Sequence, residues 1–168
     1  IYRQSIVKDP GFLPAYGRIA LGNYRIMAYQ KALAYARKGM SIDTYDPTSN
    51  YAYGLINEKL GNISEAKSGF SIASQATSLR TASLISLAQL FLKEQSYNTA
   101  IDYAKKAIEY NANSISGHQI IAFAYRQLND KENAKTAIQN IFNLDELSDF
   151  ARFEEVQLGH KDNTYFSS

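Results

Sequence analysis

The sequence predicts an all-α fold, a superhelix of antiparallel helical hairpins, from two observations. In residues 81–114, apolar residues recur at steps of three and four in two segments joined by a short polar turn, the spacing of one face of a helix. In addition, Ala32, Ala66, Ala100 and Ala134 stand 34 residues apart. A fixed interval of this length indicates similar helical hairpins stacked one after another.

Four further positions of the unit repeat with the same period. Small residues are needed where two helices cross closely, and larger apolar residues where neighbouring hairpins meet. Relative to the repeated alanine, the sets are Ala36, Phe70, Ala104 and Ile138 (four after), Gly39, Ala73, Ala107 and Ile141 (seven after), Ala20, Gly54, Ala88 and Ala122 (twelve before), and Ile19, Tyr53, Leu87 and Ile121 (thirteen before).

These residues resemble the pattern of the tetratricopeptide family, which has Leu, Gly or Ala, and Tyr in the first helix and Ala, Phe, Ala in the second. Residues 81–114 fit it well, with Phe91 in the first helix. Residues 13–46 diverge most, since Asn23 holds an aromatic position and Gly39 replaces an alanine. The resemblance covers nearly the whole chain and implies a helical solenoid whose first helices line a concave groove.

The period divides the chain into segments. Pro10 ends a helix because proline lacks the amide proton, so we expect residues 1–12 to be the end of a truncated preceding repeat in a fragment of a longer protein. Four full repeats, a capping helix that covers the last hairpin and a polar tail then follow. Their bounds are 13–46, 47–80, 81–114 and 115–148 for the repeats, 149–158 for the capping helix and 159–168 for the tail.

Polar residues mark where the second helix of most hairpins begins, because side chains there accept hydrogen bonds from free backbone amides. The turn of the first repeat is weakly marked, since Ala28 lies between helices expected near 14–27 and 29–42. In the second repeat, Asn62 and Glu65 have the spacing of a capping box. The other expected N-caps are Ser96 and Asp130.

Proline and glycine mark the limits of the first helix of the second repeat. Pro47 follows Asp46 at its start, and proline is tolerated in the first turn of a helix. Gly61 follows its end, where the chain needs the left-handed backbone that a side chain resists.

The capping helix has its apolar residues at Phe150, Phe153, Val156 and Leu158, so we expect that face to cover the last hairpin. A second, narrower resemblance rests on segments 41–62 and 150–158. They are similar to segments of large bacterial multidomain proteins with a β-rich domain of unknown function ahead of such repeats. This resemblance implies the C-terminal array of such a protein, acting as a scaffold.

Composition excludes several classes of function. A formal net charge of +2 is too small to indicate binding to nucleic acid or to an anionic membrane, and no apolar run reaches the length of a membrane span. There is no cysteine, which excludes disulfides, thiolate catalysis and thiol metal sites. The absence of cysteine leaves the compartment undetermined, with the cytoplasm slightly favoured.

The first helices supply the predicted groove, in which aromatic and aliphatic side chains alternate with cations. Such a surface suits a peptide with apolar side chains and carboxylates. Arg25, Lys59, Lys93 and Arg126 form a ladder of positive charge, or alternatively are solvated cations favoured near helix C-termini. The candidate groove residues are Leu21, Tyr24, Arg25, Tyr51, Leu55, Lys59, Gln89, Leu92, Lys93, Gln119, Phe123 and Arg126.

No constellation of catalytic or metal-binding residues stands out, so we expect no enzyme activity, no metal and no cofactor. His118 takes an aromatic position and is read as a packing residue, His160 lies in the tail, and the adjacent Glu154 and Glu155 are weak candidates for an acid/base pair. The function predicted is a non-catalytic scaffold, monomeric or weakly dimeric, that binds a protein, a peptide or another domain of its parent. The alternative is a spacer that self-associates through its repeat ends.

Overall fold

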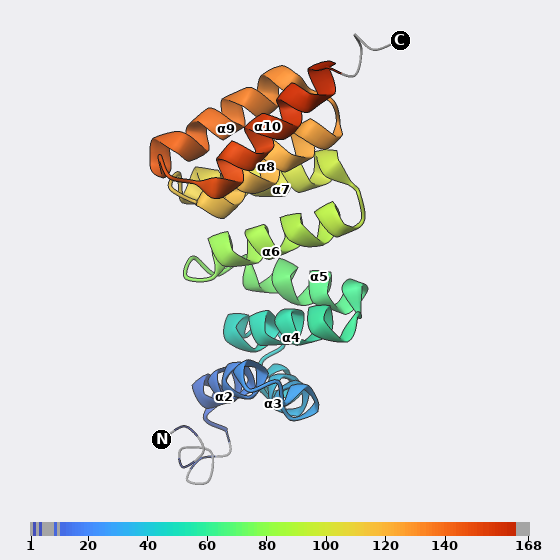
Figure 1. The fold of residues 1–168 in the computed structure, drawn as a ribbon. Coiled ribbons are helices and arrows are strands. Elements are labelled where there is room, and N and C mark those ends of the chain that lie inside the picture. Colours follow the sequence, from blue (N-terminus) through green and yellow to red (C-terminus); the bar gives the residue numbers. More distant parts are fainter. Residues whose placement is uncertain (1, 3, 5–8, 10, 164–168) are drawn as a thin grey trace. The chain divides into compact units, whose positions relative to one another are not determined.

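The computed structural model describes residues 2, 4, 9 and 11–163, with side chains up to residue 159. Every element in residues 11–163 is an α-helix (Figure 1), which confirms the all-α prediction. Most of the preceding repeat expected at 1–12 lies outside the described residues. None of these helices is both long and apolar enough to span a membrane. The helices are α2 (Leu13–Arg25), α3 (Tyr29–Ile42), α4 (Pro47–Leu60), α5 (Ile63–Ala73), α6 (Arg80–Lys93), α7 (Tyr97–Tyr110), α8 (Ile115–Gln127), α9 (Lys131–Leu144) and α10 (Asp149–Asn163).

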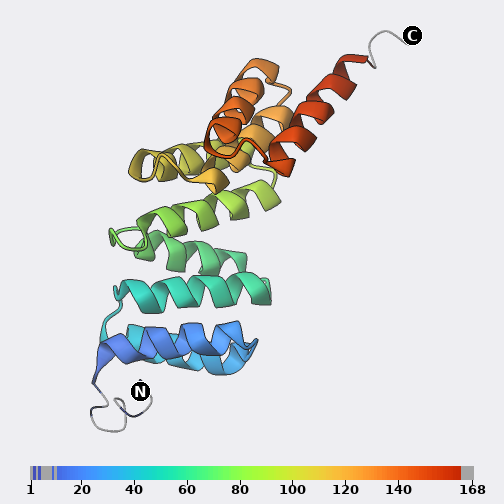
Figure 2. The same cartoon turned by 60° about the vertical axis from the view of Figure 1, so that its left-hand side comes forward.

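The helices form two compact units, residues 1–84 and 85–168. In the first unit, α2 packs against α3, α4 packs against α5, and both α2 and α3 contact α4. In the second unit, α7 packs against α8, α8 packs against α9, and α10 lies on both α8 and α9 (Figure 2). Helix α6 begins in the first unit and continues into the second, where the ring of Phe91 stacks on Tyr103 of α7 at 5.3 Å.

The alanines that define the period are all fully buried, which agrees with their predicted place at close helix contacts. Their exposed fractions are 0% at Ala32, Ala66, Ala100 and Ala134. Ala32 belongs to a core cluster in the first unit, and Ala100 and Ala134 belong to a core cluster in the second. Because a methyl group already fills these positions, a larger side chain there would force the helices apart.

Glycine allows α4 and α5 to pack closely against each other. A Cβ atom on Gly69 would lie 2.6 Å from the carbonyl oxygen of Asn50 and 2.8 Å from the amide nitrogen of Gly54. A Cβ atom on Gly54 would lie 2.7 Å from the ring of Phe70, which is fully buried. The backbones and the phenyl ring therefore occupy the space that side chains would need.

The turn inside each hairpin has the same backbone conformation. Residues with positive φ occur at Met27 (59°), Gly61 (81°), Gln95 (60°) and Asn129 (59°), each 34 residues after the last. The left-handed backbone predicted for Gly61 is confirmed, and the non-glycine residues Met27, Gln95 and Asn129 adopt the same backbone conformation. The following amide closes each turn by donating to the carbonyl five residues earlier, the bond of a Schellman motif, at 2.9 Å from Ala28 to Asn23, Asn62 to Asn57, Ser96 to Phe91 and Asp130 to Tyr125.

The predicted N-caps of the second helices are only partly formed. Asp130 accepts a hydrogen bond from the amide of Asn133 at 3.2 Å, as predicted. Ser96 and Asn62 occupy the N-cap position without a side-chain cap bond, so the capping box is not formed. The amide nitrogen Nδ2 of Asn62 instead donates to Oδ1 of Asn57 at 3.0 Å, which ties together the two ends of the turn.

The first helices of two hairpins have N-caps with a side-chain hydrogen bond. Asp46 accepts a hydrogen bond from the amide of Ser49 at 2.7 Å, and Pro47 follows in the first turn, which confirms the predicted start of α4. Ser114 accepts a hydrogen bond from the amide of Gly117 at 3.3 Å at the start of α8. These caps set the helix starts that position the predicted groove residues.

Candidate functional site

In the first unit, the predicted groove residues lie on α2 and α4 and are partly engaged in packing. Leu21 and Tyr24 are half-buried against the core cluster around Ala32. The ring of Tyr51 lies 5.7 Å from the ring of the buried Phe70. The remaining candidates of this unit are Leu55, which is half-buried, and Arg25 and Lys59, which are exposed.

Tyr24 lies in an environment that disfavours its phenolate. Burial raises the pKa of the Tyr24 hydroxyl above its usual value, and electrostatic interactions with Glu58, Tyr29 and Tyr51 raise it further. The ring of Tyr29 lies 5.8 Å from that of Tyr24. This environment therefore favours the neutral form of the Tyr24 side chain.

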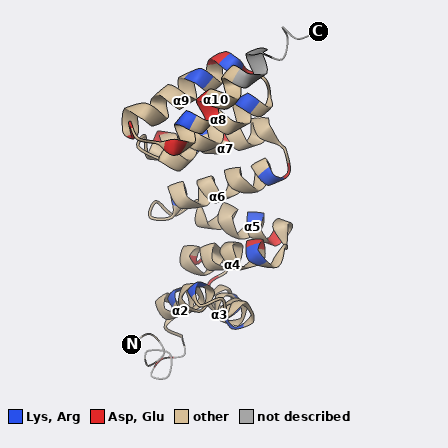
Figure 3. Ribbon diagram, viewed as in Figure 1, with Lys and Arg blue, Asp and Glu red and all other residues tan. Residues whose placement is uncertain are grey.

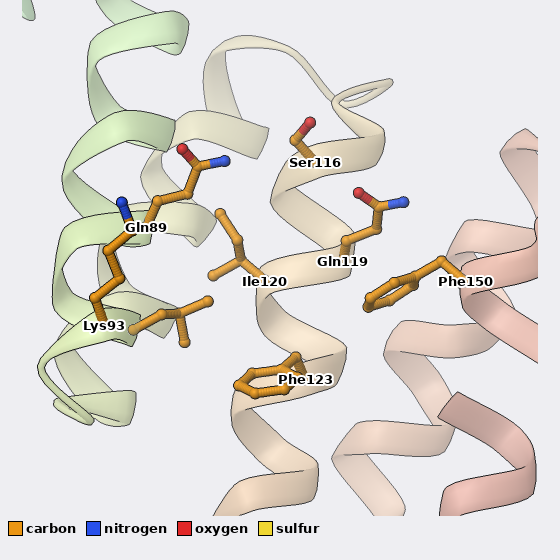
Figure 4. A pocket seen from close by; sticks show the side chains of 8 residues that line it. Gln89, Lys93, Ser116, Gln119, Ile120, Phe123 and Phe150 are labelled. Carbon is orange, nitrogen blue, oxygen red and sulfur yellow. The ribbon is translucent and has the colours of Figure 1, made fainter. Parts of the chain in front are cut away.

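In the second unit, a cavity of about 450 Å³ opens beside α6, α8 and α10 (Figure 4). We call it the α8 pocket. Figure 4 shows Phe150 extending from α10 toward Gln119 of α8, while Gln89 and Lys93 come from α6. Its lining contains five predicted groove residues, Gln89, Leu92, Lys93, Gln119 and Phe123, and three that sequence reasoning missed, Ser116, Ile120 and Phe150.

The lining of the α8 pocket is mainly apolar, with polar groups around it. Leu92, Ile120, Phe123 and Phe150 supply the apolar surface, and the amides of Gln89 and Gln119 and the hydroxyl of Ser116 supply donors and acceptors. An apolar cavity with a few oriented polar groups is the usual form of a ligand site in proteins.

Arg126, the last member of the predicted cationic ladder, is buried instead of facing a groove. Its exposed fraction is 9%, and that of Glu154 is 1%. The guanidinium donates from Nε to Oε2 of Glu154 at 2.5 Å and from Nη2 to Oε1 at 3.0 Å. It also lies 5.1 Å above the ring of Phe123. Glu154 therefore neutralises this cation and joins α10 to α8.

The family model of the tetratricopeptide repeat matches residues 81–114 and 115–146. Residues 81–146 therefore carry two tetratricopeptide repeats. The match covers α6 to α9, the hairpins that hold most of the α8 pocket. The sequence finds no match among curated proteins.

Solved structures confirm the predicted helical solenoid fold along almost the whole length of the chain. YrrB, described as a TPR protein with an unusual peptide-binding site, is 19% identical, with a TM-score of 0.80 over 97% of this chain and 84% of that one. PilF of Pseudomonas aeruginosa is 18% identical, with a TM-score of 0.84 over 96% and 74%. MamA is 17% identical, with a TM-score of 0.75 over 86% and 79%. At these identities the likeness establishes the tetratricopeptide solenoid fold.

The capping helix, α10, packs through a different face from the one predicted. Ala151, Glu154 and Leu158 are buried, whereas Phe153 and Val156 are 55% and 53% exposed. The prediction that Phe153 and Val156 cover the last hairpin is therefore wrong. The helix meets α8 and α9 along the face that carries the Glu154 carboxylate, because that group pairs with Arg126.

The remaining polar candidates have local roles in the tetratricopeptide fold. His118 is half-buried, and its Nε2 lies 3.1 Å from the carbonyl oxygen of Ala112, just before α8. The side chain of His160 lies outside the described side chains. Figure 3 shows residues of both charge signs on α9 and α10, so neither helix presents a surface of one sign.

Proposed function

We propose that this tetratricopeptide chain is a non-catalytic scaffold that binds a peptide segment of a partner, or of another domain of its parent protein, in the α8 pocket. The observation that carries the proposal is the apolar cavity of about 450 Å³, which contains five of the residues selected from repeat positions alone. Its volume lies within the range of about 300–1,000 Å³ typical of ligand sites. The description of YrrB as a TPR protein with a peptide-binding site supports the same class of ligand.

The first unit, taken by itself, carries residues of the same kind. Tyr24, Tyr51 and Leu55 are half-buried aromatic and aliphatic side chains, and Arg25 and Lys59 are exposed cations beside them in sequence. Such a combination suits contact with a peptide that carries apolar side chains and carboxylates. Because the ring of Tyr51 also contacts Phe70, replacing Tyr51 would affect folding as well as binding.

Selection of random phage-displayed peptides on the immobilised chain tests the proposal. We expect peptides to be enriched, and Phe123→Ala to weaken the best of them about tenfold or more, because a central aromatic contact is removed. Phe153→Ala is the matched control, since Phe153 is also a helical phenylalanine but lies outside the pocket and is more than half exposed. Failure to enrich any peptide, or equal affinity for wild type and Phe123→Ala, would refute the proposal.

The alternative function, self-association through a repeat end, has one observation in its favour. Phe153 and Val156 lie one helical turn apart on α10, and both are more than half exposed. If copies associate through this face, sedimentation equilibrium will give a mass that rises with concentration for the wild type and stays at that of one chain for Phe153→Ser. A constant mass for the wild type would remove this alternative.

A further inference from the structure

The α8 pocket has a composition that selects its ligand more narrowly than the proposed function requires. We infer that it takes a single large apolar side chain, aromatic or leucine, from a peptide whose charge contributes little, and that α10 is part of the binding site. The inference rests on the proposed peptide-binding function and specifies its ligand.

The first step is the apolar surface. Leu92, Ile120, Phe123 and Phe150 come from three helices and line one cavity. Two of these side chains are phenyl rings, from α8 and α10 (Figure 4). An apolar side chain that enters the cavity leaves water and contacts rings on two sides, which is the arrangement that gives binding hot spots.

The second step is the charge. Among the described residues that line the pocket, only Lys93 is charged, and its side chain is exposed. Arg126, the nearest predicted cation on α8, is held by Glu154 in a two-bond ion pair. An exposed ion pair contributes little to affinity, so a ligand carboxylate would gain little here.

The third step is the polar rim. The amides of Gln89 and Gln119 each offer donors and an acceptor, and the hydroxyl of Ser116 offers both. Uncharged groups of this kind match the N–H and C=O groups of a peptide backbone. They orient the peptide without selecting the charge of its side chains.

The fourth step is the position of α10. Phe150 and Glu154 lie one helical turn apart on this helix, and Phe123 and Arg126 lie one turn apart on α8. The Arg126–Glu154 pair therefore fastens α10 to α8 directly beside the pocket, and the Arg126 guanidinium lies over Phe123. Glu154 is thus a positioning residue for Phe150.

Selected phage-displayed peptides, titrated against variants of the full chain, test the inference. We expect the enriched peptides whose binding Ser116→Trp blocks to share one aromatic or leucine residue and no common acidic residue. Phe150→Ala lowers affinity about tenfold or more, whereas Lys93→Ala lowers it about fivefold at most. Phe153→Ala on the same helix leaves it unchanged within about twofold.

Two further measurements separate binding from folding. Ser116→Trp adds a large side chain at an exposed lining position, so it should block the pocket while the thermal melting curve stays that of the wild type. Glu154→Gln should lower the affinity of the selected peptides and, with it, the hydrogen-exchange protection of α10.

The outcomes distinguish the inference from the proposed function. A shared acidic residue in the peptides that Ser116→Trp blocks, or peptides that lose binding in Lys93→Ala and keep it in Phe150→Ala and Ser116→Trp, would overturn the inference and leave peptide binding intact. Absence of any enriched peptide would overturn the proposed function itself.

Discussion

The buried pair between Arg126 and Glu154 makes a quantitative prediction about the attachment of α10. Glu154→Gln keeps the size of the side chain and removes its charge, which leaves the guanidinium of Arg126 buried without a counter-ion. Removing one partner of a buried pair costs about 3–5 kcal/mol of unfolding free energy. Replacing both partners with apolar residues of similar volume is near neutral or stabilising, so Arg126→Met/Glu154→Leu should recover most of that loss.

The exposed pair between Lys135 and Glu132 supplies the control for this prediction. Its nitrogen and oxygen atoms lie 3.7 Å apart, and both side chains are mostly exposed. Glu132→Gln should therefore change the unfolding free energy by less than about 1 kcal/mol.

Urea denaturation and hydrogen exchange together measure the effect, because a repeat array can lose an end helix before the rest unfolds. Protection of the amides of Ala151 and Leu158 reports the opening of α10, and the urea transition reports the unfolding of the array. Wild-type protection in Glu154→Gln, or a double variant as unstable as the sum of the single variants, would refute the assignment of this pair as the fastening of α10.

The repeat geometry gives two more predictions. Met27→Gly and Gln95→Gly should each stabilise the chain by about 0.5–1 kcal/mol, because both residues have a left-handed backbone that glycine adopts without strain. For the same reason, Gly61→Ala should cost about 1 kcal/mol of unfolding free energy. Urea midpoints measure all three variants, and a loss of stability in Gln95→Gly would contradict the reasoning. Ala100→Leu should cost about 1–3 kcal/mol by overpacking a fully buried site, as judged from its melting curve, and an unchanged curve would show that the hairpin has room for the added atoms.

Much of the fold could be predicted from the sequence because the packing of each hairpin repeats at a fixed interval. Ala100 and its counterparts in the other repeats are buried because the two helices of each hairpin pack closely at that position, so the spacing of these alanines predicts where the helices meet. The turn at Gly61 was visible because glycine favours its backbone conformation. The same turn at Met27 and Gln95 gives no such signal, since the Schellman bond is made by the backbone and those side chains are exposed.

The repeat period predicted only those residues of the α8 pocket that lie on the first helix of a repeat. Gln119 and Phe123 lie on the first helix of a repeat, and repeat position alone brought them to the pocket. Phe150 was not found, because the placement of α10 depends on tertiary contacts and not on the repeat. Arg126 resembles a solvated cation in sequence, and its partner Glu154 is 28 residues away.

The recurring turn also determines where the chain tolerates a change of length. An inserted residue between the two helices of a hairpin would break the bond to the carbonyl five residues earlier and rotate the second helix by about 100°. Connections between hairpins lack this bond and differ in length: residues 43–46 and 111–114 form four-residue links that end in the caps Asp46 and Ser114, whereas residues 74–79 form a six-residue link after the shorter α5. In that longer link, Arg80 donates to the carbonyl oxygens of Ser74 and Gln75. A change of length should therefore disturb the helices less in the exposed residues 77–78 of this link than in the turn inside any hairpin.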